Sequence, residues 1–264
     1  MLKIENFEVL GWEHAIRGMR NPMNSWEQSD SKPCPILAQI NPLNETWRCS
    51  GCKNEYATEQ CWVIGENDHK LMTNLRNAGT DHRKFMRMLT VYVDITAPFY
   101  WWKEFDTYKV GTVANSCSTM HKIHAKEFTL EDFSIDIPDE YDEDFMRPED
   151  VTAVAESMVC FCESLRKSYN HYDAKSKNLE YTESERKHFK RVAKRYWRLL
   201  IQYMSISYNQ KRTVMLNYEV LANIYKSRRH HKLDEWHVLC DWIEKLPCSE
   251  LITGCAKDEA ETNV

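Results

Sequence analysis

Residues 106–121, DTYKVGTVANSCSTMH, concentrate hydroxyl, amide and cationic side chains around a single glycine. Buried groups of this kind need hydrogen-bond partners, which a ligand would supply. Hydroxyl and amide side chains can hydrogen-bond to the polar edges of a ligand ring, and a cationic side chain can pair with a ligand phosphate. The alternative is an ordinary polar strand or loop after a buried helix. We favour the ligand-binding interpretation.

Two further groups are compatible with chemistry. Cys117 is a nucleophile by type, but a cysteine in such a polar run is more often incidental. The cluster 228–231, RRHH, stands at the end of a predicted helix. It favours either simple pairing with the helix dipole or anion binding. The charged stretch 81–84, DHRK, is interpreted as a helix face or as support for a ligand cleft.

Four cysteines in the irregular N-terminal part have the spacing of a metal knuckle. Cys49 and Cys52 form a Cys-x-x-Cys turn in RCSGCKNEY, and Cys34 and Cys61 flank it. Four thiolates would complete a tetrahedral zinc site. The alternative is free thiols in a loop insertion. The remaining cysteines considered, Cys160, Cys162, Cys240 and Cys248, are predicted to be small core residues.

Composition restricts the class of protein. The chain has 264 residues, 42% hydrophobic and 28% charged, with a net charge of -5. The charge gives no reason to expect nucleic-acid binding. No apolar run approaches the roughly 20 residues that span a bilayer, and the N-terminus does not resemble a signal peptide. We expect a cytoplasmic globular protein without a membrane segment.

The elements around the polar run are predicted from local signals. A helix is expected after Asn67, and a short helix is expected after the cap Thr80. The alternating stretch 89–95, LTVYVDI, predicts a strand. Pro98 opens an aromatic helix, PFYWWKEFDTY, that should lie in the core.

Helices dominate the rest of the chain. One is predicted over 148–169, and a second opens at the capping box 182–185, TESE. Residues 207–214 are predicted to break it, and two helices follow over 214–228 and 232–245. The acidic connector before the first of these helices and the basic face of the second are interpreted as solvated surfaces.

Three segments together resemble the flavin-dependent thymidylate synthases. They are AGTDHRKFMR, VYVDITAPFYWWKEFDTYKVGTVANSCSTMH and SYNQKRTVMLNYEVLANIYKSRRHHKLDEW, within residues 65–124 and 195–247. The resemblance implies an α+β fold, helix-rich with a central β-sheet, and a homotetramer with its active site between subunits. We divide the chain into an N-terminal segment with a cysteine insertion (1–64), a synthase-like core (65–254) and a polar tail (255–264).

The resemblance also implies a binding site. The family's Arg-His-Arg motif falls on residues 107–109, where only the last cation is kept, and its Ser/Asn-rich motif falls on 115–121. The resulting cofactor- and nucleotide-binding set is Glu104, Tyr108, Lys109, Asn115, Ser116, Ser118, His121, Arg212, Asn217 and Arg228.

The implied activity is one-carbon transfer to deoxyuridylate, a pyrimidine deoxynucleotide, with FAD as cofactor and folate as the carbon donor. The alternative hypothesis is a non-catalytic relative that acts as an interaction module, with the zinc knuckle as a structural element. The missing arginines favour the alternative, and the dense polar wall favours the enzyme.

Overall fold

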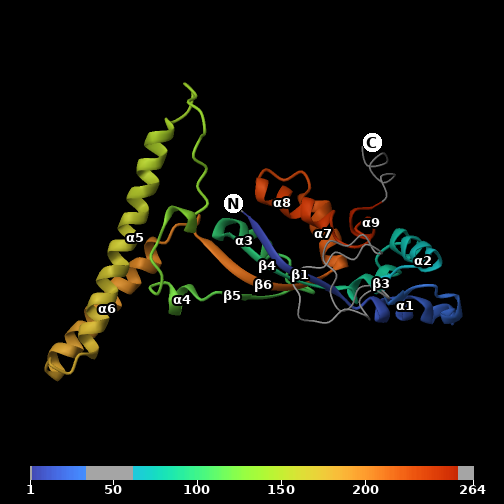
Figure 1. Ribbon diagram of the computed structural model, residues 1–264, viewed down its shortest axis with the longest axis horizontal. Helices are drawn as coiled ribbons and strands as arrows, with labels where there is room; N and C mark the ends of the chain where they lie inside the picture. Colours follow the sequence, from blue (N-terminus) through green and yellow to red (C-terminus); the bar gives the residue numbers. More distant parts are fainter. Residues whose placement is uncertain (1, 34–61, 255–264) are drawn as a thin grey trace. The chain divides into compact units, whose positions relative to one another are not determined.

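The computed structural model describes residues 2–33 and 62–254 and shows a helix-rich α+β fold (Figure 1). This confirms the predicted fold class. The chain forms two compact units. Unit 1 contains Thr96–Glu104 and Ser116–Lys211, and unit 2 contains Leu2–Ile95, Phe105–Asn115 and Arg212–Val264. The division into an N-terminal segment, a core and a tail stays a prediction.

The main sheet has four strands in the order β1-β4-β6-β5. Their bounds are β1 Lys3–Leu10, β4 Thr90–Pro98, β5 Val113–Ser116 and β6 Asn209–Asn217. The predicted strand is confirmed in β4, where Val91, Val93 and Ile95 are buried. Sequence analysis missed β1 and β6, whereas β5 lies within the run for which a strand or loop was the alternative interpretation. A two-stranded antiparallel sheet joins β2 Lys32–Pro33 to β3 Trp62–Val63.

The expected helix break at 207–214 is confirmed, since α6 ends at Tyr203, but the stretch forms strand β6. Val214 and Leu216 alternate inward along it, so the stretch is extended and half-buried. The following helix, α7 Tyr218–Arg228, therefore begins at Tyr218 and not at 214. Asn217 ends the strand and caps the helix, because its side-chain oxygen accepts the Val220 N–H at 3.1 Å.

The helices of unit 2 differ from the predictions mainly at their starts. Helix α2 begins at Glu66, so Asn67 is inside it and is not its cap. The short helix predicted after Thr80 is the 3₁₀ helix η4 Arg83–Arg87. The remaining elements here are α1 Trp12–Arg20, η1 Asn21–Met23, η2 Trp26–Gln28, α2 Glu66–Asn77, α8 Asp234–Ile243 and α9 Glu250–Thr253.

Unit 1 is built on a helical hairpin, α5 Pro148–Lys177 and α6 Glu183–Tyr203 (Figure 1). Helix α5 continues beyond the predicted end at residue 169. The capping box is confirmed, since Thr182 accepts the Glu185 N–H and Glu185 accepts the Thr182 N–H at 2.8 Å. Shorter elements are α3 Phe99–Phe105, α4 Thr119–Lys122 and η5 Leu130–Asp132.

The core of unit 1 fixes the chain after α4 against the hairpin. Its buried residues are Ile123, Phe128, Phe133, Cys162, Leu165 and Leu200. Burial is confirmed for Cys162 and Cys240, whereas Cys248 is only half-buried. The prediction for Cys160 is wrong, because this thiol is exposed. It lies two residues before Cys162, about 200° around the helix, and so faces solvent.

Candidate functional site

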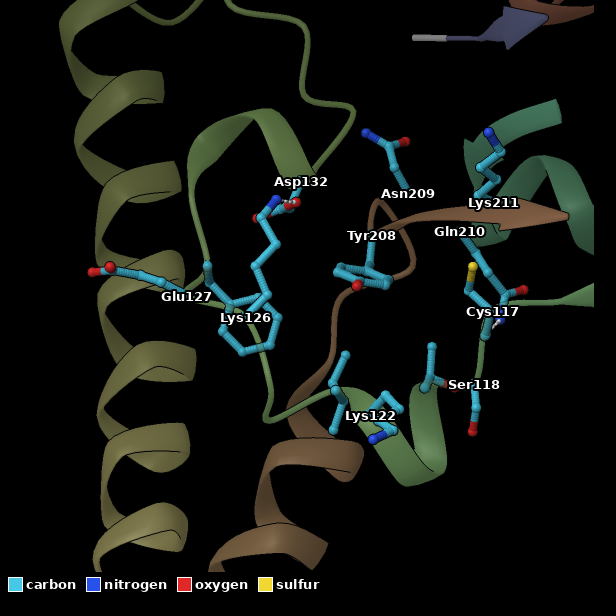
Figure 2. A pocket seen from close by; sticks show the side chains of 13 residues that line it. Cys117, Ser118, Lys122, Lys126, Glu127, Asp132, Tyr208, Asn209, Gln210 and Lys211 are labelled. Carbon is cyan, nitrogen blue, oxygen red and sulfur yellow. Dashed lines mark hydrogen bonds and ion pairs between the residues drawn. The ribbon is translucent and has the colours of Figure 1, made fainter. Parts of the chain in front are cut away.

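A cavity of about 280 Å³ lies within unit 1 (Figure 2). Its walls come from the start of β6, from the chain just after β5, and from the segment between α4 and η5. The lining residues are Cys117, Ser118, Thr119, Lys122, Ile123, Lys126, Glu127, Phe128, Asp132, Tyr208, Asn209, Gln210 and Lys211. The cavity thus joins an apolar floor to a polar and cationic rim.

The rim carries an excess of positive charge. Lys122, Lys126 and Lys211 outnumber the carboxylates of Glu127 and Asp132. Lys126 is neutralised by an ion pair with Asp132 at 2.9 Å. Lys122 is exposed and makes no ion pair within residues 2–33 and 62–254. Its ammonium is therefore available to an anion.

Tyr208 forms the centre of the cavity wall (Figure 2). Its ring packs edge-on against Phe133, with 5.6 Å between centroids. Burial raises the pKa of the Tyr208 hydroxyl, with smaller contributions from Asp132 and Cys117. The phenol consequently stays protonated at neutral pH and can donate a hydrogen bond to a ligand.

Backbone contacts hold the opposite wall at Cys117. The Cys117 N–H donates to the Lys211 carbonyl at 2.9 Å, and its own carbonyl accepts from Gln210 Nε2 at 2.9 Å. The Gln210 carbonyl in turn accepts from Trp102 Nε1 at 2.9 Å. The aromatic helix α3 thereby supports the cavity wall through Trp102.

The floor is tied to α5 by a partly buried ion pair. Glu163 accepts from Arg166 at 2.6 and 2.7 Å and from the Phe128 N–H at 3.2 Å. Arg166 and Asn170 also donate to the His124 carbonyl, at 3.2 and 3.1 Å. These contacts position residues 123–128 beneath the cavity. Arg166 beside Glu163 lowers the pKa of that carboxyl.

A second cluster lies in unit 2 around Arg228. The Arg228 Nε donates to the Tyr108 hydroxyl at 2.9 Å. The guanidinium carbon is 4.7 Å from the Trp236 ring centroid and 5.7 Å from that of Tyr108. Hydrogen bonding and cation–π attraction together fix the orientation of the guanidinium.

The polar run around this cluster carries an unsatisfied group. The Thr112 hydroxyl oxygen is buried and has no hydrogen-bond partner within the described chain. Lys109 is exposed and forms no ion pair with any described residue. Arg212, in contrast, pairs with Asp106 at 2.7 Å. Buried polar groups without partners point to a ligand or to bound water.

The structure distributes the predicted residues over several environments. Tyr108 and Arg228 are in contact, and Ser118 lines the cavity. Asn217 caps α7, and Arg212 is held in an ion pair. The others are not shown to share one pocket: Glu104 is half-buried, and Lys109, Asn115, Ser116 and His121 are exposed.

Sequence reasoning missed most of the cavity. Tyr208, Gln210 and Lys211 were placed in a helix break, because the polar run 209–213 and the unbroken apolar run 214–216 carry no strand alternation. Lys122 and Lys126 carry no recognisable motif. Trp236, which stacks on Arg228, falls within the resembling segment but was not singled out.

The predicted zinc ligands Cys34, Cys49, Cys52 and Cys61 lie outside the described residues, so the zinc knuckle stays a prediction. Within residues 2–33 and 62–254, no group of three His, Cys, Asp or Glu side chains is arranged to hold a metal ion. None of the helices in these ranges has the length and apolar character needed to span a membrane.

No family model and no curated protein matches this sequence. Solved structures do match. Thymidylate synthase X from Helicobacter pylori with FAD and dUMP superimposes with a TM-score of 0.55 at 15% identity, covering 96% of this chain and 97% of that one. A second structure of that enzyme with FAD and dUMP agrees, with a TM-score of 0.55 at 14% identity and 96% of each chain.

A third match is the UMP/dUMP methylase PolB from Streptomyces cacaoi bound to 5-Br dUMP. Its TM-score is 0.52 at 11% identity, over 96% of this chain and 95% of that one. At these identities the likeness concerns the fold. The chain therefore has the fold of the flavin-dependent thymidylate synthases, as its motifs indicated.

Proposed function

We propose that this protein is a nucleotide-modifying enzyme that transfers a one-carbon group to a pyrimidine deoxynucleotide such as dUMP, with FAD as cofactor and folate as carbon donor. The observation that carries the proposal is the lysine-rimmed cavity of unit 1, in a fold whose solved representatives hold dUMP or its bromo derivative. We further propose assembly as a homotetramer in the cytoplasm.

In the cavity, a nucleotide phosphate pairs with the ammonium of Lys122. The protonated Tyr208 phenol and the hydroxyl of Ser118 serve polar edges of the sugar or base. Phe128 supplies an apolar surface for the ring. The volume of about 280 Å³ approaches the range of small-ligand pockets, which begins near about 300 Å³, so it suits one nucleotide rather than a dinucleotide.

The residues of unit 2 fit a flavin. Thr112 has an unsatisfied buried hydroxyl, Lys109 has an available ammonium, and Arg228 lies against the rings of Trp236 and Tyr108. These groups would hold an anionic cofactor with a polar ring system. When bound, a flavin supplies hydride chemistry. The chain itself binds and orients the ligands and neutralises their charge.

Binding of dUMP to the purified full-length chain tests the substrate proposal. Lys122→Ala removes one charge-assisted contact and should weaken dUMP binding by roughly tenfold or more, corresponding to about 1.5 to 3 kcal/mol. Lys187→Ala is the matched control, since Lys187 is an exposed lysine on α6 paired with Glu183. Equal affinities of the two variants, measured by titration calorimetry, would remove Lys122 from the site.

Flavin binding is tested separately by absorbance. We expect a yellow protein, or uptake of added FAD by colourless protein, and a weaker complex in Lys109→Ala. Protein that remains colourless in excess FAD would refute the cofactor assignment. It would support the second candidate, a non-catalytic interaction module. That candidate is favoured by one observation: within 107–109 only Lys109 keeps a cation, and Arg212 is engaged by Asp106.

A further inference from the structure

Helix α6 carries a face of unpaired cations, which we call the basic stripe: Lys190, Arg191, Lys194, Arg195 and Arg198. All five side chains are exposed, and none makes an ion pair within residues 2–33 and 62–254. They cover about 140° of the helix surface. The stripe lies opposite the face that packs on α5 through Ala193 and Leu200.

The stripe also lacks neutralising neighbours in sequence. From residue 186 to the end of α6 there is no Asp or Glu, although the whole chain has a net charge of -5. Like charges at helical spacing repel one another and destabilise an isolated helix. A complementary anionic partner would relieve this repulsion.

The same unit exposes a segment with the opposite pattern, which we call the acidic strap, residues 136–146, DIPDEYDEDFM. It holds six acidic residues and no cation. Its carboxylates form no ion pair with any part of the chain that the structure describes. Three of its apolar side chains are largely exposed, namely Tyr141 (66%), Phe145 (59%) and Met146 (53%).

Apolar surface also flanks the basic stripe. Phe161 and Tyr203 form an edge-to-face pair with 5.3 Å between centroids, yet they are 47% and 60% exposed. Leu199, beside Arg198, is 38% exposed. Stripe and strap therefore complement each other in both charge and apolar content, as two sides of an interface do.

The strap leaves the stripe of its own chain uncovered, since no ion pair joins the two segments within the described residues. The strap starts just after Ser134, whose N–H donates to the Ser207 carbonyl at 2.8 Å, and it ends at the first turn of α5. Figure 1 shows it running along the N-terminal end of α5, away from α6. The stripe lies beside the far half of α5, where Tyr172 stacks on Tyr196 at 5.7 Å. Tyr172 is about 36 Å along the helix from Pro148.

We propose that the acidic strap of one copy of this chain docks on the basic stripe of a second copy. Extended, the strap spans at most about 36 Å, which exceeds the roughly 12 Å length of the stripe, so one strap can cover it. A twofold axis would make the contact reciprocal, with each copy donating its strap. This interface is independent of the proposed activity.

Sedimentation equilibrium with two charge-reversed variants tests the proposal. One variant carries Lys190→Glu, Arg191→Glu and Lys194→Glu. The other carries Asp139→Lys, Glu140→Lys, Asp142→Lys and Glu143→Lys, which turns the strap from -6 to +2. Each alone should associate about tenfold or more weakly than wild type, because both faces of a copy then carry the same sign. An equimolar mixture should recover association, since each strap again meets a stripe of opposite charge.

Recovery on mixing also guards against misfolding, because a variant that cannot fold would not recover. Unchanged association of the single variants, or no recovery in the mixture, would overturn the proposal. Binding of a labelled DNA duplex to the wild type and to both variants is measured as well. If wild type binds it and only the stripe variant loses this binding, without any change in mass, the stripe serves a nucleic acid and the proposal fails.

Discussion

Replacing Glu163 by alanine should destabilise unit 1 and loosen the floor of the cavity. The Glu163 residue is 8% exposed, and its carboxylate accepts two bonds from Arg166 and one from the Phe128 N–H. Alanine leaves the Arg166 guanidinium, with a side chain only 14% exposed, without its carboxylate. It also leaves the Phe128 N–H without an acceptor.

The magnitude follows from these two losses. Removing one partner of a buried ion pair costs about 3 to 5 kcal/mol, because an uncompensated charge stays buried. Arg166 keeps its bond to the His124 carbonyl and retains some solvent contact, so the expected cost is about 3 kcal/mol, the lower end of this range. For a chain of this size, such a loss lowers the melting temperature by about 6 to 12 °C.

Thermal and urea unfolding of the two alanine variants Glu163→Ala and Glu156→Ala would measure this. Glu156 lies on the same helix, is exposed and makes no ion pair with a described residue. Its replacement should change the free energy of unfolding by less than about 0.5 kcal/mol. Indistinguishable unfolding curves for the two variants would refute the role given to Glu163.

Three further predictions concern pH, backbone and stacking. Arg166 holds the pKa of Glu163 below its ordinary 4.5. The Glu163 carboxylate therefore stabilises the fold above that pH, and the stabilisation is lost as the pH falls through the lowered pKa. Glu163→Gln should show a shallower acid-induced loss of unfolding free energy, measured by urea titration from about pH 6 to pH 2. Gly111→Ala should lower the free energy of unfolding by at least about 1 kcal/mol more than Gly79→Ala does in chemical denaturation. Both glycines have positive φ (76° and 103°), but of the two only Gly111 has side chains near a new Cβ, at 3.0 Å. Equal losses for the two variants would exclude this crowding. Arg228→Lys should lose about 1 to 2 kcal/mol of stability, since lysine cannot donate through Nε while stacked, and an unchanged urea midpoint would contradict the stacked arrangement.

Several elements were predictable because their signals are local. The β-branched alternation around Val91 and Val93 marked β4, and the Thr182–Glu185 box marked the start of α6. Both rest on residues within a few positions of each other. The family motifs likewise indicated the α+β fold before any coordinates. The acidic connector and the basic helix face were both recognised as exposed.

The candidate sites depended on pairings between distant segments. From its sequence, β6 was interpreted only as a helix break. The structure shows it as a strand paired with β4 and β5, and a strand is stabilised by neighbours that its own sequence does not specify. The cavity joins Ser118 to Lys211 across more than ninety residues, and Arg228 meets Tyr108 across a separation of 120. Residue types and local periodicity established which side chains could bind an anion. Only long-range packing selected the ones that share a site, since burial and proximity arise from the whole fold.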